Sequence, residues 1–410
     1  MLKGRSEQCH RQPDASGDED GEGGDEREDE QPTGRHRAQR YPRYDLLMTS
    51  PRFDYASRLA RARAAMEERG VDALLLSVGP DLPYLTGYEA MPLERLTMFA
   101  VTAEDAVLVV PQLEAPRVEP GPFETRPWGE LEDPVRLVAG IVGGARSVLI
   151  GDHTWATFVL SLQDALPEAR FGPAGELMAS LRVRKEPAEV DLLRQAAQAA
   201  DRVLARLAEV DMAARTEREV ARLVAEWTVE EGHDVDTFKI VAAGPNAASP
   251  HHEPTDRVIE RGDVVIVDFG GRLGGYCSDT TRTFVVGDPT PEQEEVHAVV
   301  LAAQRAAAQA VRPGAIPAEI DAAARRVIGE AGYGEYFIHR TGHGIGLEVH
   351  EHPYIIETNS QPVEPGMAFS IEPGIYLPGR FGVRIEDIVV VTDDGVEILN
   401  DSDRSLVQIG

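Results

Sequence analysis

Apolar residues in the first part of the chain recur with helical spacing and then in short unbroken runs. Residues 55–69 place Leu59, Ala62 and Met66 on one side of a helix. The runs that follow have the length of buried strands and lie at residues 71–77, 106–110 and 147–151. Helices that alternate with buried strands predict a small α/β domain, which we place at residues 49–180.

From residue 181 onward the pattern reads helix, helix, strand pair, and then repeats. The first round has helices at residues 188–210 and 216–231 and strands at 264–269 and 276–284. The second round has helices at about 290–311 and 317–331 and strands at 367–372 and 382–392. In the first round the second helix begins with a capping box of Thr216 and Glu219, and the second round begins with a helix-start signal at Thr290, Pro291 and Gln293. The repeated order predicts an internal duplication over residues 181–410, with a site between the two halves.

Residues 1–48 show neither the helical spacing nor the short apolar runs of the rest of the chain. Asp, Glu and Gly dominate residues 14–30, and residues 35–43 are basic. Such a segment cannot bury enough apolar area to order itself, so we expect a disordered acidic and basic tail.

Two aspartates interrupt the apolar pattern of the first strand pair. Residues 264–269 and 276–284 flank a glycine-rich connection, which is a β-hairpin signal. A two-residue loop at residues 273 and 274 would set Asp268 directly opposite Asp279, with Cβ atoms about 4.5–5.5 Å apart. Two carboxylates placed so closely repel each other unless a cation or a proton lies between them. The hairpin therefore predicts a metal site.

Two glutamates and a histidine-rich loop extend this pattern. Glu372 and Glu386 interrupt the second strand pair as the aspartates interrupt the first, and His343 lies in the glycine-rich loop before them. Four carboxylates and one imidazole suit two divalent metal ions. Oxygen ligands favour Mn²⁺ or Mg²⁺, and the imidazole shifts the preference toward transition metals. We expect manganese, with cobalt or zinc as alternatives.

Composition excludes several classes of partner. The chain has 70 acidic and 41 basic residues, for a net charge of −29, which argues against nucleic acid and anionic membranes as partners. No apolar run of about 20 residues predicts a membrane span. The N-terminus lacks the apolar stretch of a signal peptide, so we expect a cytoplasmic protein. The two cysteines, Cys9 and Cys277, cannot build a disulfide framework.

From about residue 187 to the C-terminus the chain resembles the pita-bread metallopeptidases, namely Xaa-Pro dipeptidases (prolidases), aminopeptidases P and methionine aminopeptidases. The matching motifs are VDFGG, SDTTRT, TGHGIG, SIEPGIY and RIED, which contain Asp268, Asp279, His343, Glu372 and Glu386. The resemblance implies an α+β fold, with a pita-bread catalytic domain at residues 181–410 after a smaller creatinase-type N-terminal α/β domain. It also implies that Asp268 chelates one metal, that His343 and Glu372 chelate the other, and that Asp279 and Glu386 bridge both.

The resemblance assigns further roles in hydrolysis by a water that bridges the two metals. It implies that His251 contacts the substrate, with His252 as the alternative if the register differs by one, and that His350 hydrogen-bonds the substrate carbonyl. Glu372 would pass a proton to the leaving nitrogen, and Arg384 would orient carboxylates or form an ordinary salt bridge. Three residues near the site by sequence receive no role: His339, His352 and Tyr376.

The choice within the family rests on two features. The N-terminal domain argues against methionine aminopeptidase, which lacks one, and the complete ligand set argues against creatinase and against a non-catalytic peptide-binding module. We favour an Xaa-Pro dipeptidase that acts as a homodimer on proline-containing dipeptides or short peptides. The alternatives are an aminopeptidase P that acts on longer peptides and a two-domain relative that hydrolyses or cleaves a small molecule other than a peptide.

Overall fold

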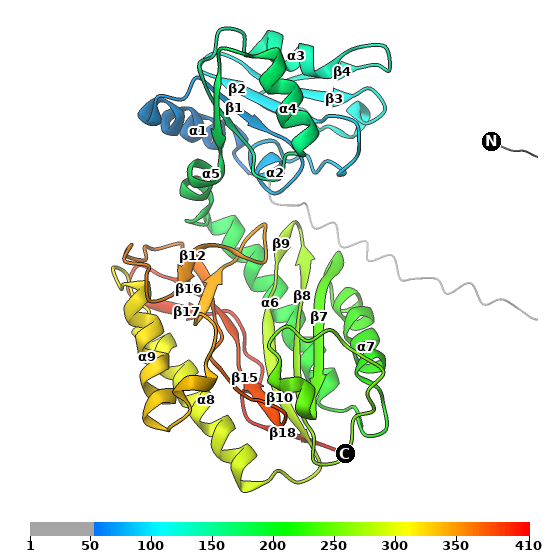
Figure 1. Ribbon diagram of the computed structural model, residues 1–410, viewed down its shortest axis with the longest axis vertical. Coiled ribbons are helices and arrows are strands. Elements are labelled where there is room, and N and C mark those ends of the chain that lie inside the picture. The colour runs from blue at the N-terminus through cyan, green and yellow to red at the C-terminus, as the bar shows by residue number, and fades with distance from the viewer. Residues whose placement is uncertain (1–52) are drawn as a thin grey trace, which may run out of the picture. The chain divides into compact units, whose positions relative to one another are not determined.

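The computed structural model describes residues 53–410, so the predicted tail at residues 1–48 lies outside the described residues (Figure 1). Within residues 53–410, no helix combines the length and apolar character needed to cross a membrane.

A six-stranded mixed sheet organises the first part of the described chain, in the strand order β4-β3-β2-β1-β5-β6. Its strands are β1 (Ala73–Leu76), β2 (Met98–Thr102), β3 (Ala106–Pro111), β4 (Glu124–Trp128), β5 (Ser147–Ile150) and β6 (Arg170–Pro173). The helices are α1 (Tyr55–Arg69), α2 (Asp81–Thr86), α3 (Pro134–Ile141), α4 (Ala156–Ala165) and α5 (Gly175–Arg182). Leu74 and Leu76 pack against α1, α2 and α5, whereas Leu75 packs against α3 and α4. Alternate residues of β1 thus enter two cores, and the predicted α/β architecture is present.

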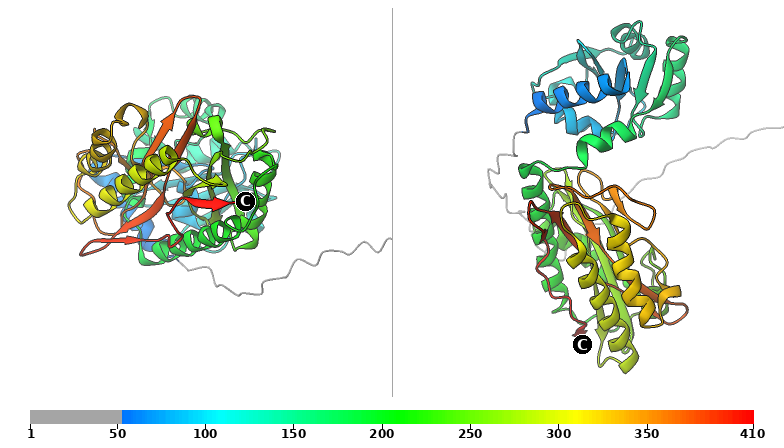
Figure 2. Two further views of the ribbon diagram at one scale, coloured as in Figure 1. Left: turned by 90° about the horizontal axis from the view of Figure 1, so that it is seen from below. Right: turned by 90° about the vertical axis from the view of Figure 1, so that its left-hand side faces the viewer.

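Two further five-stranded sheets follow, and a pair of long helices covers each of them (Figures 1 and 2). The first has the order β18-β10-β8-β7, with β9 paired to β8, and packs against α6 (Pro187–Leu207) and α7 (Glu217–Glu230). The second has the order β12-β11-β13-β16-β17 and packs against α8 (Pro291–Ala310) and α9 (Pro317–Glu330). The strands of the first sheet are β7 (Val235–Ala243), β8 (Val264–Leu273), β9 (Tyr276–Cys277), β10 (Thr280–Val286) and β18 (Val407–Ile409). Those of the second are β11 (Gly342–Gly344), β12 (Glu351–Ile355), β13 (Ala368–Ile371), β16 (Asp387–Val391) and β17 (Val396–Ile398), and β14 (Gly374–Leu377) pairs separately with β15 (Phe381–Arg384). The helix, helix, sheet order occurs twice, as the sequence predicts.

The register of the first hairpin differs from the prediction by two residues. Leu273 pairs with Tyr276, so Gly274 and Gly275 form the loop, with φ angles of 58° and 88°. A two-residue loop with positive φ at both central positions suits two glycines, whereas the predicted loop required Leu273 in this region. Asp268 consequently lies opposite Thr281, and Asp279 lies in the break between β9 and β10.

The second pair of strands is also less regular than predicted. Ile385 and Glu386 interrupt the predicted strand at residues 382–392, and Glu372 follows the end of β13. The backbone N–H of each glutamate donates outside the pairing of β13 with β16. Glu372 N donates to Thr341 O at 2.8 Å, and Glu386 N donates to Thr281 O at 3.2 Å. The ladder therefore opens at the two acids, and carbonyls of β10 and of the residue before β11 accept from their backbone N–H groups.

Candidate metal centre

The five predicted ligands converge in one place. Three groups each hold ligand atoms within 4.8 Å of one another: Asp268, Asp279 and Glu386; His343, Glu372 and Glu386; and Asp279, His343 and His350. Asp268, Asp279, His343 and Glu386 are all buried, with 7% or less of each residue exposed. The prediction that carboxylates from both halves meet is thus reproduced by the geometry, although Asp279 does not oppose Asp268 on the ladder.

The orientation of the His343 ring suits a metal ligand. Its Nδ1 lies 3.2 Å from Gly344 O, and because a carbonyl oxygen only accepts, Nδ1 carries the hydrogen. In the neutral ring the lone pair is therefore on Nε2, which lies 3.2 Å from Glu372 Oε1 and 3.5 Å from Asp279 Oδ2. A lone pair that faces two carboxylates is stabilised by a cation or a proton among them.

Two buried oxygens test the fit of metal ions independently. Asp268 Oδ1 and Glu386 Oε1 are buried and have no hydrogen-bond partner within the described residues. An uncompensated buried carboxylate oxygen is costly, and a bound divalent cation removes that cost. Burial and the neighbouring carboxylates raise the pKa values of Asp279 and Glu386 well above their ordinary range. The donor set therefore fits two divalent cations.

A chain of hydrogen bonds orients the carboxylates. Arg384 Nη2 donates to Asp268 Oδ2 at 2.5 Å, and Arg384 Nε donates to Thr281 Oγ1 at 3.1 Å. Thr281 in turn donates to Glu386 Oε2 at 2.7 Å. In the second sheet, the Ser370 hydroxyl accepts from His343 N and donates to Glu372 Oε1 at 3.2 Å. The sequence did not predict roles for Thr281 and Ser370, although each lies two residues from an acid, the spacing that puts both side chains on one face of a strand.

The two candidate histidines of the loop after β7, His251 and His252, have different surroundings. His251 lines the cavity that contains the acids, whereas His252 Nε2 lies 2.9 Å from Glu217 Oε2 outside it. Glu217 is fully buried and also accepts from the backbone N–H groups of Ala243 and Thr255. Because Glu217 holds the loop at both ends, His251 and not His252 faces the site.

The remaining histidines differ in their contacts. His350 is exposed at the cavity wall, and its ring centroid lies 4.1 Å from that of His343. His339 also lines the cavity, and its Nε2 accepts from the Tyr376 hydroxyl at 2.8 Å. His352 faces away from this cavity and packs on Tyr354. Of these three histidines, His350 and His339 therefore line the cavity and His352 does not.

The cavity itself has a volume of 630 Å³ and walls from both sheets. Its apolar wall consists of Phe238, Ile240, Val349 and Ile356. These residues were not predicted, since nothing in their local pattern distinguishes them from core residues. The volume lies in the range of small-molecule sites, about 300–1,000 Å³.

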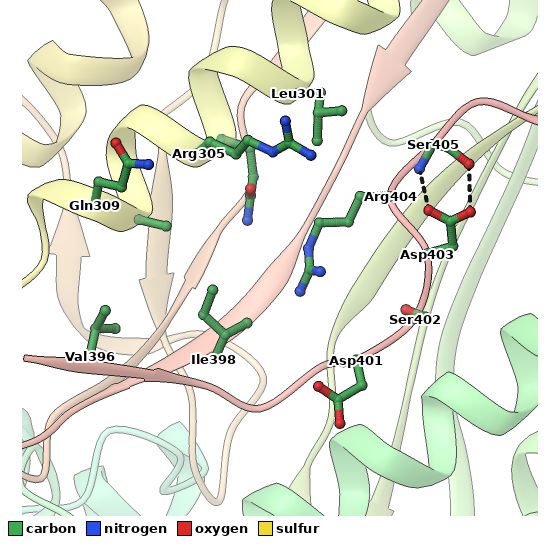
Figure 3. A pocket seen from close by; sticks show the side chains of 12 residues that line it. Leu301, Arg305, Gln309, Val396, Ile398, Asp401, Ser402, Asp403, Arg404 and Ser405 are labelled. Carbon is green, nitrogen blue, oxygen red and sulfur yellow. Dashed lines mark hydrogen bonds between the residues drawn. The ribbon is translucent and has the colours of Figure 1, made fainter.

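A second pocket, of 520 Å³, lies between α8 and the C-terminal segment (Figure 3). Two of its charged side chains form contacts within the fold: Arg404 Nε donates to Asp387 Oδ2 at 2.5 Å, and Asp403 accepts from Ser405. None of the three groups of ligand atoms borders it. The 630 Å³ cavity is the candidate active site.

Close backbone packing explains the glycines around His343. A Cβ at Gly342 would lie 1.9 Å from Ser370 O. Replacement of Gly342 by alanine is expected to destabilise the protein by about 1–3 kcal/mol, because the two backbones cannot separate without moving β11 from β13. Urea unfolding measures the effect. Gly329→Ala in α9 is the control, since nothing lies within 4 Å of its Cβ, and it should stabilise by about 0.5–1 kcal/mol. Shifts of the same sign in both variants would contradict this account.

Comparison with known proteins matches both parts of the chain. The family model described as Creatinase/Prolidase N-terminal domain matches residues 58–184, and the model described as Metallopeptidase family M24 matches residues 191–393. A probable dipeptidase PepE of Mycobacterium tuberculosis is 45% identical over 373 residues, which cover 88% of this chain and 99% of that protein. The chain belongs to metallopeptidase family M24. The fold class and the family were therefore predicted correctly from the sequence. The candidate site residues of this M24 peptidase lie in the segment that the M24 model matches.

Solved structures agree with this assignment. The crystal structure of dipeptidase PepE from Mycobacterium ulcerans has a TM-score of 0.80 and 46% identity, and covers 87% of this chain and 99% of that one. A recombinant prolidase from Thermococcus sibiricus has a TM-score of 0.84 and 38% identity, and covers 87% and 100%. The protein is a metallopeptidase, and its acidic and histidine groups can hold the metal. The boundary predicted between residues 180 and 181 stays a prediction.

Proposed function

We propose that this M24 peptidase hydrolyses the imide bond of Xaa-Pro dipeptides. The convergence of five metal-ligand side chains in one 630 Å³ cavity carries the proposal. The relatives that are named prolidase, such as that of Thermococcus sibiricus, support the substrate class.

The grouping of the ligand atoms supports the proposed sharing of two metal ions. Asp268 and Glu372 each belong to one group, whereas Asp279, Glu386 and His343 each belong to two. A histidine nitrogen has one lone pair and binds one ion, whereas a carboxylate has two oxygens and can bind two. Asp268 would therefore hold one ion, His343 and Glu372 the other, and Asp279 and Glu386 both. Manganese suits this set of oxygens and one imidazole, with cobalt or zinc as alternatives. When bound, two divalent cations acidify a water molecule and polarise the scissile carbonyl.

The protein's own groups supply the remaining steps. His350, exposed beside His343, would donate an N–H to the scissile oxygen as negative charge develops there. Glu372 would carry a proton to the leaving nitrogen, with the Ser370 hydroxyl holding its Oε1. Arg384 would position Asp268, and His251 on the cavity wall would contact the substrate.

Proline makes the bond a tertiary amide without an N–H, so the site needs shape rather than hydrogen bonds at the leaving group. The apolar wall offers that shape. Phe238 and Ile240 come from β7 in the first sheet, and Val349 and Ile356 flank β12 in the second. A pyrrolidine ring would be desolvated between them while its imide carbonyl lies among the polar groups.

Proline release from Ala-Pro tests the proposal. After chelator dialysis the enzyme should lose activity, and Mn²⁺ should restore it together with about two ions per chain. Hydrolysis of Ala-Pro-Ala alone would indicate aminopeptidase P, and hydrolysis of neither peptide would reject the proposal. A preparation that binds no stoichiometric metal would indicate a binding module instead.

Two further expectations from the sequence remain proposals. We propose a homodimer, which light scattering of the purified chain tests. We also propose a cytoplasmic location, which fractionation of the source cells tests.

A further inference from the structure

The connection between α7 and β7 (residues 231–234) contains a buried histidine that the proposed chemistry does not use. His233 is 3% exposed, and its ring lies against β8, where a Cβ at Gly271 would be 2.6 Å from it. Burial lowers the pKa of His233, so the ring is neutral at pH 7. A neutral imidazole has one donor and one acceptor, and in a protein core both need partners.

Both ring nitrogens of His233 have such partners. Nδ1 lies 3.1 Å from Thr228 O, and because a carbonyl oxygen only accepts, Nδ1 carries the hydrogen. Nε2 therefore has the lone pair and accepts from the Ser278 hydroxyl at 2.8 Å. Ser278 Oγ in turn accepts from Gly271 N at 3.1 Å, whereas Gly271 O, a second acceptor for the hydroxyl, lies farther away at 3.5 Å. The ring of His233 thus fixes the direction of the Ser278 hydroxyl.

The backbone around Ser278 is constrained as well. Ser278 N donates to Gly271 O at 2.8 Å, and a Cβ at Gly270 would lie 2.1 Å from Ser278 O. At the turn of the same hairpin, Asp234 Oδ2 accepts from Gly274 N at 2.7 Å. The connection between α7 and β7 therefore holds the hairpin both at its loop and at Ser278.

Ser278 directly precedes Asp279, a proposed ligand of both metal ions. These two residues form the break between β9 and β10, which no strand pairing covers. The hydroxyl of Ser278 is held by His233, whereas the next side chain, that of Asp279, lies among the ligand atoms of Asp268 and Glu386. We infer that His233 is a positioning residue for Asp279, because through Ser278 it fixes the break and thereby the direction of the carboxylate. The inference rests on the proposed two-ion centre and extends it.

The affinity of the chelator-dialysed protein for Mn²⁺, measured by titration calorimetry, tests this inference without a substrate. His233→Phe keeps a buried ring but removes the acceptor, and it should weaken Mn²⁺ binding by about 10- to 100-fold, the usual loss when a partner of a metal ligand is removed. Ser278→Ala removes only the hydroxyl and should cause a loss of similar size. The double variant should lose no more than either single variant, because both act through one hydrogen bond.

His297→Phe is the matched control. His297 lies on α8 and is 5% exposed, its Nε2 has no hydrogen-bond partner in the part of the chain that the structure describes, and it does not line the 630 Å³ cavity. The same substitution of a buried histidine away from the acids should leave Mn²⁺ affinity within about twofold. An equal loss of affinity in His297→Phe and His233→Phe would overturn the inference.

The other outcomes also decide. Unchanged Mn²⁺ affinity in His233→Phe and Ser278→Ala would overturn the inference even if both variants unfolded at a lower temperature, because a purely structural role acts on folding alone. Losses that add in the double variant would overturn it too, since the two residues would then act separately. If His233→Phe does not fold, Ser278→Ala decides alone. A wild type that binds about two Mn²⁺ ions but hydrolyses no Ala-Pro would reject the proposed function and not the role of His233.

Discussion

Asp279→Asn should reduce hydrolysis of Ala-Pro by more than about 100-fold and lower the metal content of the purified enzyme. Even residues that only orient metal ligands cost about 10–100-fold when they are removed. Asp279 offers ligand atoms to two of the three groups, so its loss weakens both proposed ion positions. Activity and bound manganese are measured on the same dialysed preparation.

The same substitution should have the opposite effect on the stability of the metal-free protein. Without cations, Asp279 lies beside Asp268 and Glu386; burial raises its pKa, and these two carboxylates raise it further. Removing one acid relieves the repulsion, so in chelator Asp279→Asn should unfold at a higher temperature than the wild type. With Mn²⁺ the order should reverse, because only the wild type binds the ions tightly in its folded state.

Asp256→Asn provides the control for a lost aspartate. The Asp256 side chain is 79% exposed and pairs with Arg218 at the surface. Asp256→Asn should therefore change the unfolding temperature little, both in chelator and in Mn²⁺. If Asp279→Asn destabilised the protein equally in both conditions, the acids would be structural and not a metal centre.

Arg182→Gln should destabilise the protein by about 3–5 kcal/mol, since it leaves buried carboxylates without a cation. Arg182 is 7% exposed and lies at the end of α5. It donates to Asp81 at 2.7 Å and to Glu348 at 2.8 Å, and it also pairs with Glu351. Urea unfolding of the two proteins measures the difference.

The pH dependence of this difference follows from the carboxyl groups. Burial raises the pKa of Asp81 even beside Arg182. Burial also opposes ionisation of Glu351, but Lys185 and Arg182 hold its pKa below the ordinary value. Without Arg182 both acids bind protons more readily in the folded state, so the variant should recover part of its stability as pH falls toward about 4. A difference that grows as pH falls would contradict this reading.

Arg182 also supports the segment that contains His350, which has a proposed role in catalysis. Glu348 and Glu351 bracket His350, so both ends of its segment depend on the same guanidinium. We expect Arg182→Gln to lower kcat for Ala-Pro as well. Arg184→Gln is the matched control: Arg184 and its partner Glu364 are 62% and 53% exposed, and their loss should cost less than about 1 kcal/mol.

The sequence by itself determined most of the helices, the fold class and the five candidate ligands, whose role as ligands stays a proposal. Capping boxes such as that of Thr216 and Glu219 are local hydrogen bonds, and they are present as predicted. Each acid interrupts an apolar strand pattern, and burial of an unpaired charge is so costly that the interruption indicated a cation before any contact was known.

Only the tertiary structure decided which side chains face one another. Arg384 bonds to Asp268 across 116 residues and Thr281 to Glu386 across 105, so neither pairing has a local signal. The loop at Gly274 moved the register by two residues, because backbone conformation and not side-chain pairing set the turn. Pairing over long sequence distances depends on packing that a linear pattern does not contain.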